Sequence, residues 1–167
     1  MKRTDWFDGY AGEKAEELFS YPAKNQYAAL VQGFREGIQR KAERKGEKAL
    51  TSEERVVLSV MALHQEVNNG GYDQFFRNSS RKFARIAVDS LERIGRRREA
   101  KTTQSAVDAL RLTTLTASRI RAAMAITNDE RDRELEQCDQ AFYKTQKGVA
   151  KSLYAFIEAN KDRIAFS

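Results

Sequence analysis

The 167-residue sequence contains few of the residues that interrupt or cross-link a chain. It has one proline, nine glycines and a single cysteine, Cys138. So few breakers in a chain of this length favour helices joined by short connections. The lone cysteine excludes an intramolecular disulfide, and we expect Cys138 to pack on a helix and to be unreactive.

Long apolar runs are also missing. No run approaches the roughly 18 residues of a membrane span, and the N-terminal segment Met1–Gly9 has no apolar signal region. We therefore expect a cytoplasmic protein without membrane association. The only histidine, His64, has no second histidine one turn away, so the zinc-protease arrangement is absent. We prefer a structural histidine, in the core or at its edge, to a metal ligand. We predict no metal and no cofactor.

Apolar residues recur at helical spacing along the whole chain. Tyr27, Leu30 and Phe34 belong to one stripe of a helix that we expect to start at Pro22 and to end near Gly46. Thr51-Ser-Glu-Glu54 reads as a capping box, and the helix that follows is apolar on nearly every face, which predicts a central position. No convincing alternation of period two appears, which argues against a sheet.

The fold expected from this pattern is all-α. We predict a single compact domain over residues 1–167 with about seven or eight helices, large enough to bury roughly 70% of its unfolded surface. Thr127-Asn-Asp-Glu130 is a second candidate capping box. Besides the two helices above, the predicted segments are 11–20, a short helix around Phe75, 80–95, 100–126, one after residue 130, and 148–162.

The stretch from Glu66 to Ser80 joins the apolar helix to an aromatic segment through a pair of glycines. We expect the glycines to end or sharply bend the helix, and the aromatic side chains to be largely buried. The polar side chains either line a small pocket or form a joint whose amides satisfy free backbone groups at the helix ends, and we prefer the joint. The residues of this motif are Glu66, Asn68, Asn69, Gly70, Gly71, Gln74, Phe75, Phe76 and Asn78.

The same stretch resembles a known family. The string from Glu66 to Ser79, the preceding Thr51–Arg55, Leu91–Gly95 and Cys138–Phe142 are similar to a bacterial domain-of-unknown-function family that includes a DNA mimic. The resemblance covers about residues 25–160. It implies an all-helical domain and a protein-binding role, because the mimic is an acidic protein that occupies the DNA-binding surface of a transcription factor.

The net charge of +6 is unevenly distributed. Residues 77–98 hold eight basic and two acidic residues and so account for the whole excess. Asp89 and Glu92 lie four residues from arginines and can pair with them, including Glu92 with Arg96. We prefer a solvated face to a phosphate-binding one, because no nucleic-acid motif accompanies the stretch. The candidate basic patch consists of Arg77, Arg81, Lys82, Arg96, Arg97 and Arg98.

Residues 129–139 hold six acidic and two basic residues. Asp129, Asp132, Glu136 and Asp139 are spaced three, four and three apart, which predicts one helical stripe about 15 Å long. This stripe is either a short imitation of a phosphate backbone or a set of acids favoured near a helix N-terminus. We prefer the second interpretation.

No nucleophile, base and orienting acid occur with catalytic spacing, so we predict no catalytic residues and no enzyme activity. The function that we expect is binding of an unidentified protein partner. The alternative is a nucleic-acid-associated protein that uses residues 77–98, with weak binding expected. DNA mimicry through a local acidic face, or an uncharacterised enzyme, comes third. A homo-oligomer stays open.

Overall fold

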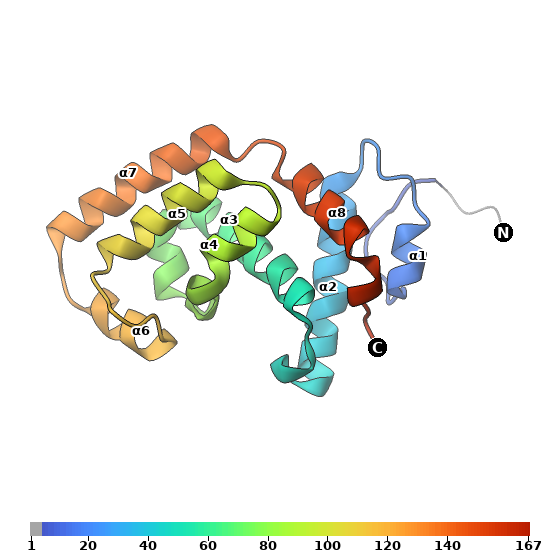
Figure 1. The fold of residues 1–167 in the computed structure, drawn as a ribbon, viewed down its shortest axis with the longest axis horizontal. Helices are drawn as coiled ribbons and strands as arrows, with labels where there is room; N and C mark the ends of the chain where they lie inside the picture. The colour runs from blue at the N-terminus through green and yellow to red at the C-terminus, as the bar shows by residue number, and fades with distance from the viewer. Residues whose placement is uncertain (1–4) are drawn as a thin grey trace. The chain divides into compact units, whose positions relative to one another are not determined.

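The computed structural model describes residues 5–167, and all of the regular secondary structure in this range is helical (Figure 1). Within these residues there are eight α-helices, three short 3₁₀ segments and no strand, which confirms the all-α class. No helix in this range combines the length and the apolar character needed to cross a membrane. The helices are α1 (Ala15–Phe19), α2 (Tyr27–Lys45), α3 (Ser52–Arg77), α4 (Ala84–Arg93), α5 (Arg97–Ala109), α6 (Ala117–Ala125), α7 (Asp129–Thr145) and α8 (Val149–Ala159).

The described residues gather into two compact units. The first unit contains residues 5–58 and 148–167, and the second contains residues 59–147. Helix α3 contributes its start to the first unit and the rest to the second. Its apolar residues are buried on nearly every face, as expected, with Val57, Leu63 and Val67 all fully buried. The single compact domain expected over residues 1–167 stays a prediction.

The first unit is built around α2, which packs against α1 and α8. Phe34 on α2 contacts the rings of Phe19 and Phe166, with ring centroids 4.8 and 5.9 Å apart. A Cβ atom at Gly37 would lie 2.4 Å from the Phe166 ring, so the glycine lets this ring rest directly on the helix. The predicted apolar stripe of α2 is therefore the core face of this unit.

A buried carboxylate holds three segments of the first unit together. Glu54 is 0% exposed and accepts two hydrogen bonds from Lys41 Nζ, at 2.8 and 2.9 Å. It also accepts the backbone N–H groups of Thr51 and Ala165, both at 3.0 Å, while its own N–H donates to Thr51 Oγ1 at 3.1 Å. The capping box predicted at Thr51 is thus confirmed, and its glutamate also ties α2 and the C-terminal segment to the start of α3.

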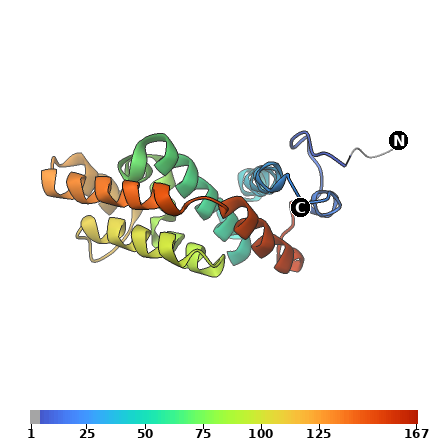
Figure 2. The same ribbon diagram turned by 90° about the horizontal axis from the view of Figure 1, so that it is seen from above.

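The second unit contains most of α3 and all of α4 to α7. Helix α5 packs against both α4 and α7, and Figures 1 and 2 show α7 running alongside α5. The interior of this unit is aromatic: Tyr72, Phe75, Phe76 and Phe142 are all fully buried.

The helix expected over residues 100–126 is wrong, because the chain forms two helices there. Arg111 adopts a left-handed φ of 53° and ends the run of α5, and Thr116 then caps α6 by accepting the N–H of Arg119 at 3.2 Å. The Arg111 guanidinium bonds to Glu134 at 2.8 Å, which holds the connecting segment against α7. Thr116 is the signal in the sequence that marked the second start.

Other helix boundaries also differ from the expected ones. Helix α2 starts at Tyr27 and not at Pro22, because the buried amide of Gln26 donates to the carbonyls of Asp5 and Pro22 and accepts the N–H of Phe7. Helix α1 is shorter than 11–20, and α4 starts only after the 3₁₀ segment Ser79–Phe83. The cap of α7 is Asn128, one residue after the expected Thr127, and it accepts the N–H of Arg131 at 3.0 Å.

Replacing Lys41 with methionine tests the Glu54 cluster. We expect Lys41→Met to lower the free energy of unfolding by about 3–5 kcal/mol, because it leaves a buried carboxylate without its cation. Lys45→Met, at an exposed position of the same helix, is the matched control. Urea unfolding at neutral pH measures both. Adding Glu54→Gln to Lys41→Met should recover part of the loss, and a single variant as stable as the control would contradict the role of the pair.

Candidate functional site

Two glycines break α3 in the middle of the second unit. Gly70 has φ −159° and ψ 22°, and Gly71 has φ 74° and ψ −177°, so neither continues the helix. The left-handed φ of Gly71 favours glycine strongly. The sharp bend predicted from Asn69-Gly70-Gly71 is confirmed, and it creates a new helix start at Tyr72 inside α3.

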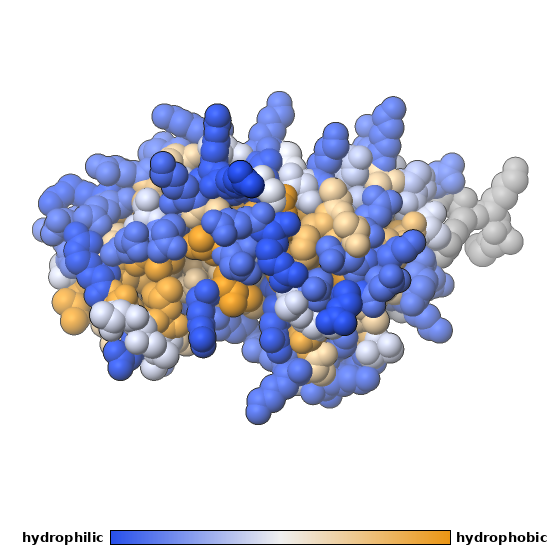
Figure 3. Space-filling model, in the orientation of Figure 1, coloured by the Kyte–Doolittle hydropathy of each residue, from blue (hydrophilic) through white to orange (hydrophobic). Residues whose placement is uncertain are grey.

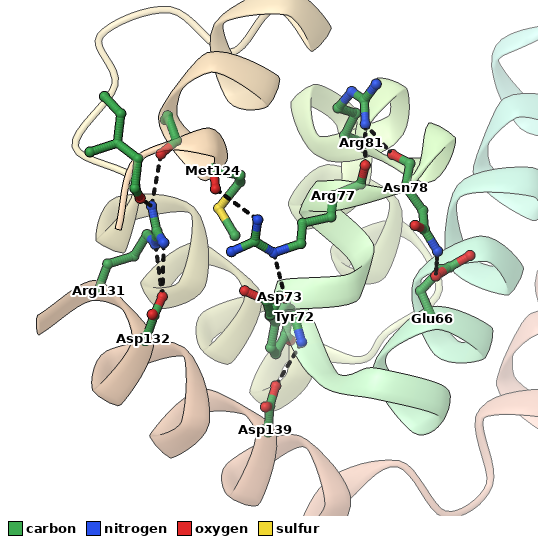
Figure 4. Close-up of polar contacts among 12 residues, drawn as sticks. Glu66, Tyr72, Asp73, Arg77, Asn78, Arg81, Met124, Arg131, Asp132 and Asp139 are labelled. Carbon is green, nitrogen blue, oxygen red and sulfur yellow. Dashed lines mark hydrogen bonds and ion pairs between the residues drawn. The ribbon is translucent and has the colours of Figure 1, made fainter. Parts of the chain in front are cut away.

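Helix α7 caps this new start. Asp139 Oδ1 accepts the backbone N–H of Tyr72 at 2.7 Å, and Figure 4 shows the carboxylate pointing at the first turn after the break. A Cβ atom at position 71 would lie 2.3 Å from Asp139 Oδ2. Gly71 therefore serves both the backbone angle and the close approach of the carboxylate. On the other side of the break, Asn68 Nδ2 donates to the His64 carbonyl at 2.8 Å.

The amides of the motif converge on one carboxylate. Glu66, one turn before the break, accepts a hydrogen bond from Gln74 Nε2 at 2.8 Å. It also accepts one from Asn78 Nδ2 at 2.9 Å (Figure 4). Gln74 and Asn78 thus bond to the end of the neighbouring first half of α3, as predicted, but their acceptor is the Glu66 side chain and not a free backbone group. Asn69 is exposed. The polar groups of the motif are used mainly inside the joint, which supports the structural interpretation over the pocket.

Aromatic side chains of the core pack against the joint. Phe75 and Phe76 are both 0% exposed, as expected, and their ring centroids lie 5.3 Å apart. The hydroxyl of Tyr72, which burial deprives of solvent, lies 2.8 Å from Thr103 Oγ1 on α5. Burial also raises the pKa of this tyrosine. The break in α3 is thus fixed by hydrogen bonds on one side and by the core on the other.

One end of the candidate basic patch is used by the fold. Arg77 donates to Asp73 at 2.7 Å and to the Met124 carbonyl at the end of α6 at 2.8 Å (Figure 4). Arg81 donates to the carbonyls of Asn78, at 3.0 Å, and Arg77. Lys82 lies 5.2 Å from the centre of the Phe83 ring. Arg77 and Arg81 thus donate to carbonyl groups at the ends of helices, and the Arg77 side chain stays 46% exposed.

Arg96 is also engaged, and its partner differs from the expected one. It donates to Glu99 at 2.7 Å and to the carbonyls of Thr145 and Lys147, the latter at 2.9 Å. The pairing with Glu92 expected from a four-residue spacing does not apply, because Arg96 lies after the end of α4, where helical spacing is lost. The predicted patch is therefore divided. Of Arg96, Arg97 and Arg98, only Arg97 and Arg98 are exposed.

Glu99 links Arg96 to the single histidine. Its carboxylate is 1% exposed and lies 2.7 Å from His64 Nε2, while the His64 ring packs on Phe142 at 4.6 Å. His64 is buried, as expected for a structural histidine. Glu99 was missed in the sequence, because 35 residues separate it from His64 and no periodicity connects them.

The acidic stripe of α7 points mostly outward. Asp129, Asp132 and Glu136 are exposed, and Asp139 is half-buried. Hydrophilic side chains dominate the surface over α7 (Figure 3). The stripe meets Asp73, which the second half of α3 brings beside it and which the sequence analysis did not single out. We call Asp73, Asp129, Asp132, Glu136 and Asp139 the acidic face.

The electrostatics of the acidic face reflect this crowding. Burial raises the pKa of Asp139, the Tyr72 N–H opposes that rise, and the charges of Asp73 and Glu136 add to it. The hydrogen bond to Asp73 raises the pKa of Arg77, and Asp132 adds to this shift. Asp132 also accepts from Arg131 at 2.9 Å. Asp73 and Glu136 thus act on Asp139, while Asp73 and Asp132 act on Arg77, which lies beside these carboxylates.

The environment of Cys138 does not activate its thiol. Cys138 is buried, and burial is the main cause that raises the pKa of its thiol to about 11. Little thiolate forms near neutral pH at such a value. Among residues 5–167, no group of three or more histidine, cysteine, aspartate and glutamate side chains has the geometry to hold a metal ion.

Comparison with known protein families places the chain. A family model described as DMP19-like protein matches residues 48–160, about two thirds of the chain, so the chain belongs to the DMP19-like family. DMP19 is a DNA-mimic family, and the resemblance seen in the motif is confirmed at this level. No curated protein and no solved structure matches the chain. The matched region includes the break in α3 and the whole acidic face.

Truncating Phe75 tests the core under the joint. We expect Phe75→Ala to cost about 3–5 kcal/mol of unfolding free energy, as a large core truncation does. Phe75→Leu, which keeps most of the volume, should cost less than about 1.5 kcal/mol. Denaturant unfolding followed by circular dichroism measures both. Near-wild-type stability of the alanine variant would show that the motif is a surface feature and would favour the pocket.

Two substitutions at Asp139 separate its hydrogen bond from its charge. Asp139→Ala removes the cap of the second half of α3 and should cost about 0.5–2 kcal/mol of unfolding free energy. Asp139→Asn keeps an oxygen that accepts the Tyr72 N–H and removes the repulsion from Asp73 and Glu136, so it should cost less. Equal losses in the two variants on urea unfolding would contradict this assignment.

Proposed function

We propose that the protein acts without catalysis by binding a protein partner through the acidic face. The observation that supports this most directly is the convergence of five carboxylates from α7 and from the second half of α3. A partner of matching chemistry presents a basic surface of the kind that binds nucleic acid. The role is thus a local form of DNA mimicry, in agreement with membership of the DMP19-like family.

The acidic face has charge to offer a partner. Asp129 and Glu136 are exposed and form no side-chain hydrogen bond or ion pair within residues 5–167. Asp73 forms an ion pair with Arg77, and Asp132 forms one with Arg131, so these two carboxylates contribute less to the charge offered to a partner. Exposed, unneutralised carboxylates attract a basic surface and suppress wrong partners by repulsion.

The spacing of the carboxylates sets the scale of the mimicry. On α7 they recur every three or four residues, so they lie about 4.5–6 Å apart along the axis. One DNA strand carries a phosphate about every 3.4 Å along its axis. The acidic face therefore carries its charges more sparsely than one DNA strand does and imitates only a short length of it, so a partner needs further contacts beyond charge.

The nucleic-acid alternative has less support. Arg77, Arg81 and Arg96, three of the eight basic residues of the arginine-rich stretch, donate to carbonyls and carboxylates of the protein itself and so have less to offer phosphates. The cytoplasm remains the compartment that we propose.

An affinity experiment tests the proposal. The wild-type protein is immobilised, and native lysate is passed over it with and without nuclease. We expect one protein to be retained in stoichiometric amount whether or not nuclease is present. Duplex DNA should elute this protein, because DNA and the acidic face compete for one basic surface. Asp129→Asn with Glu136→Gln should weaken retention about tenfold, since two unneutralised charges are lost.

The control removes two charges elsewhere. Glu43→Gln with Glu158→Gln changes the net charge equally at exposed positions of the first unit. Retention by this variant should match the wild type. A partner that DNA does not displace, or that both double variants lose equally, would contradict mimicry through the acidic face. Recovery of nucleic acid alone would favour the alternative.

A further inference from the structure

A basic groove lies in the second unit, away from the acidic face. It is formed where the turn between α4 and α5 meets the end of α7, and its volume is about 460 Å³. The side chains around it are predominantly cationic. They include Arg97 and Arg98 from the first turn of α5 and Lys144 and Lys147 from the end of α7 and the residues after it.

Arg96 forms the floor of the groove. Its side chain is only 18% exposed, and its guanidinium joins Glu99 to the carbonyls of Thr145 and Lys147. This one side chain therefore holds the two walls together. The walls keep their separation because the contact is charge-assisted and partly buried. The buried Glu99 neutralises Arg96 itself, so the charge offered to a ligand comes from the four other cations.

These four cations have no acidic partner. Arg97, Arg98, Lys144 and Lys147 are all exposed, and none forms an ion pair within the part of the chain that the structure describes. Elsewhere in the second unit, Arg77, Arg111 and Arg131 do pair with carboxylates. Four unpaired cations around one concavity repel one another, so an anion placed between them is favoured.

The composition of the walls indicates the class of ligand. No aromatic and no large apolar side chain lines the groove, so nothing stacks on a base or covers a sugar. The volume lies within the range of about 300–1,000 Å³ typical of small-ligand sites. We propose that the groove binds an oligophosphate, a chain of two or three linked phosphate groups, as free triphosphate or as the tail of a nucleotide.

A polynucleotide fits the surroundings less well. A nucleic-acid track needs cations that continue along the strand. Asp89 and Glu92 on the adjacent α4 are exposed, and Arg77 and Arg81 at the other end of the stretch are used by the fold. Acidic residues thus flank the groove on α4, and part of the arginine-rich stretch is used inside the protein, which favours a compact ligand over a continuous strand.

Calorimetric titration with inorganic triphosphate tests this proposal. At about 50 mM salt we expect one triphosphate per chain, with affinity falling as salt is raised to about 150 mM because the sites are exposed. Arg97→Ala with Arg98→Ala, and separately Lys144→Ala with Lys147→Ala, should each weaken binding about tenfold or more, since each pair removes two charge-assisted contacts. Circular dichroism verifies that the variants are folded.

Matched controls make the outcome decisive. Arg119→Ala with Arg121→Ala removes two exposed cations of α6 and should leave the affinity within about twofold of the wild type. Asp129→Asn with Glu136→Gln should also bind as the wild type does, so this test is independent of the proposed partner. Absence of binding at low salt, or an equal loss in the α6 control, would overturn the proposal. Tighter binding of a 12-nucleotide strand than of triphosphate would also overturn it and assign the groove to nucleic acid.

Discussion

The second unit depends on the break in α3 and on the carboxylate that caps it. A helix interrupted at Gly70 and Gly71 exposes backbone N–H groups in a region where the side chains below are fully buried. Such groups need acceptors, because an unsatisfied donor away from water costs about 1–3 kcal/mol. Asp139 supplies one from α7, and this contact places α7 beside the second half of α3. The geometry that satisfies the break therefore also assembles the acidic face.

Buried and half-buried charge is used throughout as a connector. Lys41 with Glu54 joins the helices of the first unit, and Glu99 joins His64 to Arg96 in the second. Arg77 and Arg131 extend the principle, because each neutralises the carbonyl end of α6 while pairing with an aspartate. Some of the arginines that make the sequence basic thus form contacts within the protein. Net charge alone says little about which surface a partner meets.

The sequence predicts the helices better than it predicts their contacts. Apolar spacing, the Thr51 capping box and the glycine pair are local signals, and they yield the fold class, the start of α3 and its break. The split between α5 and α6 is harder to predict, because Arg111 takes a left-handed angle and is held by Glu134, which lies 23 residues later.

The candidate sites depend on long-range neighbours even more strongly. The acidic stripe of α7 follows from spacing, but Asp73 joins it only through the fold. Likewise the basic stretch over residues 77–98 can be seen in the sequence. The sequence does not show which of its arginines bond within the protein and which stay exposed. Arg77 and Arg96 donate hydrogen bonds to the carbonyls of Met124, Thr145 and Lys147, which lie far from them along the chain.

A positive net charge and an acidic binding face are compatible because screening makes charge recognition local. At physiological ionic strength the Debye length is about 8 Å, so a partner in contact with α7 responds mainly to carboxylates within one or two helical turns. Lysines and arginines farther away affect the approach of a partner more than the contact itself. Within the acidic face, the charges of Asp73 and Glu136 add to the rise that burial causes in the pKa of Asp139, so these neighbours act on it locally. A small acidic surface can therefore present a phosphate-like field on a protein whose total charge is +6. The same reasoning applies to the basic groove, whose four cations need only be local to attract a compact anion.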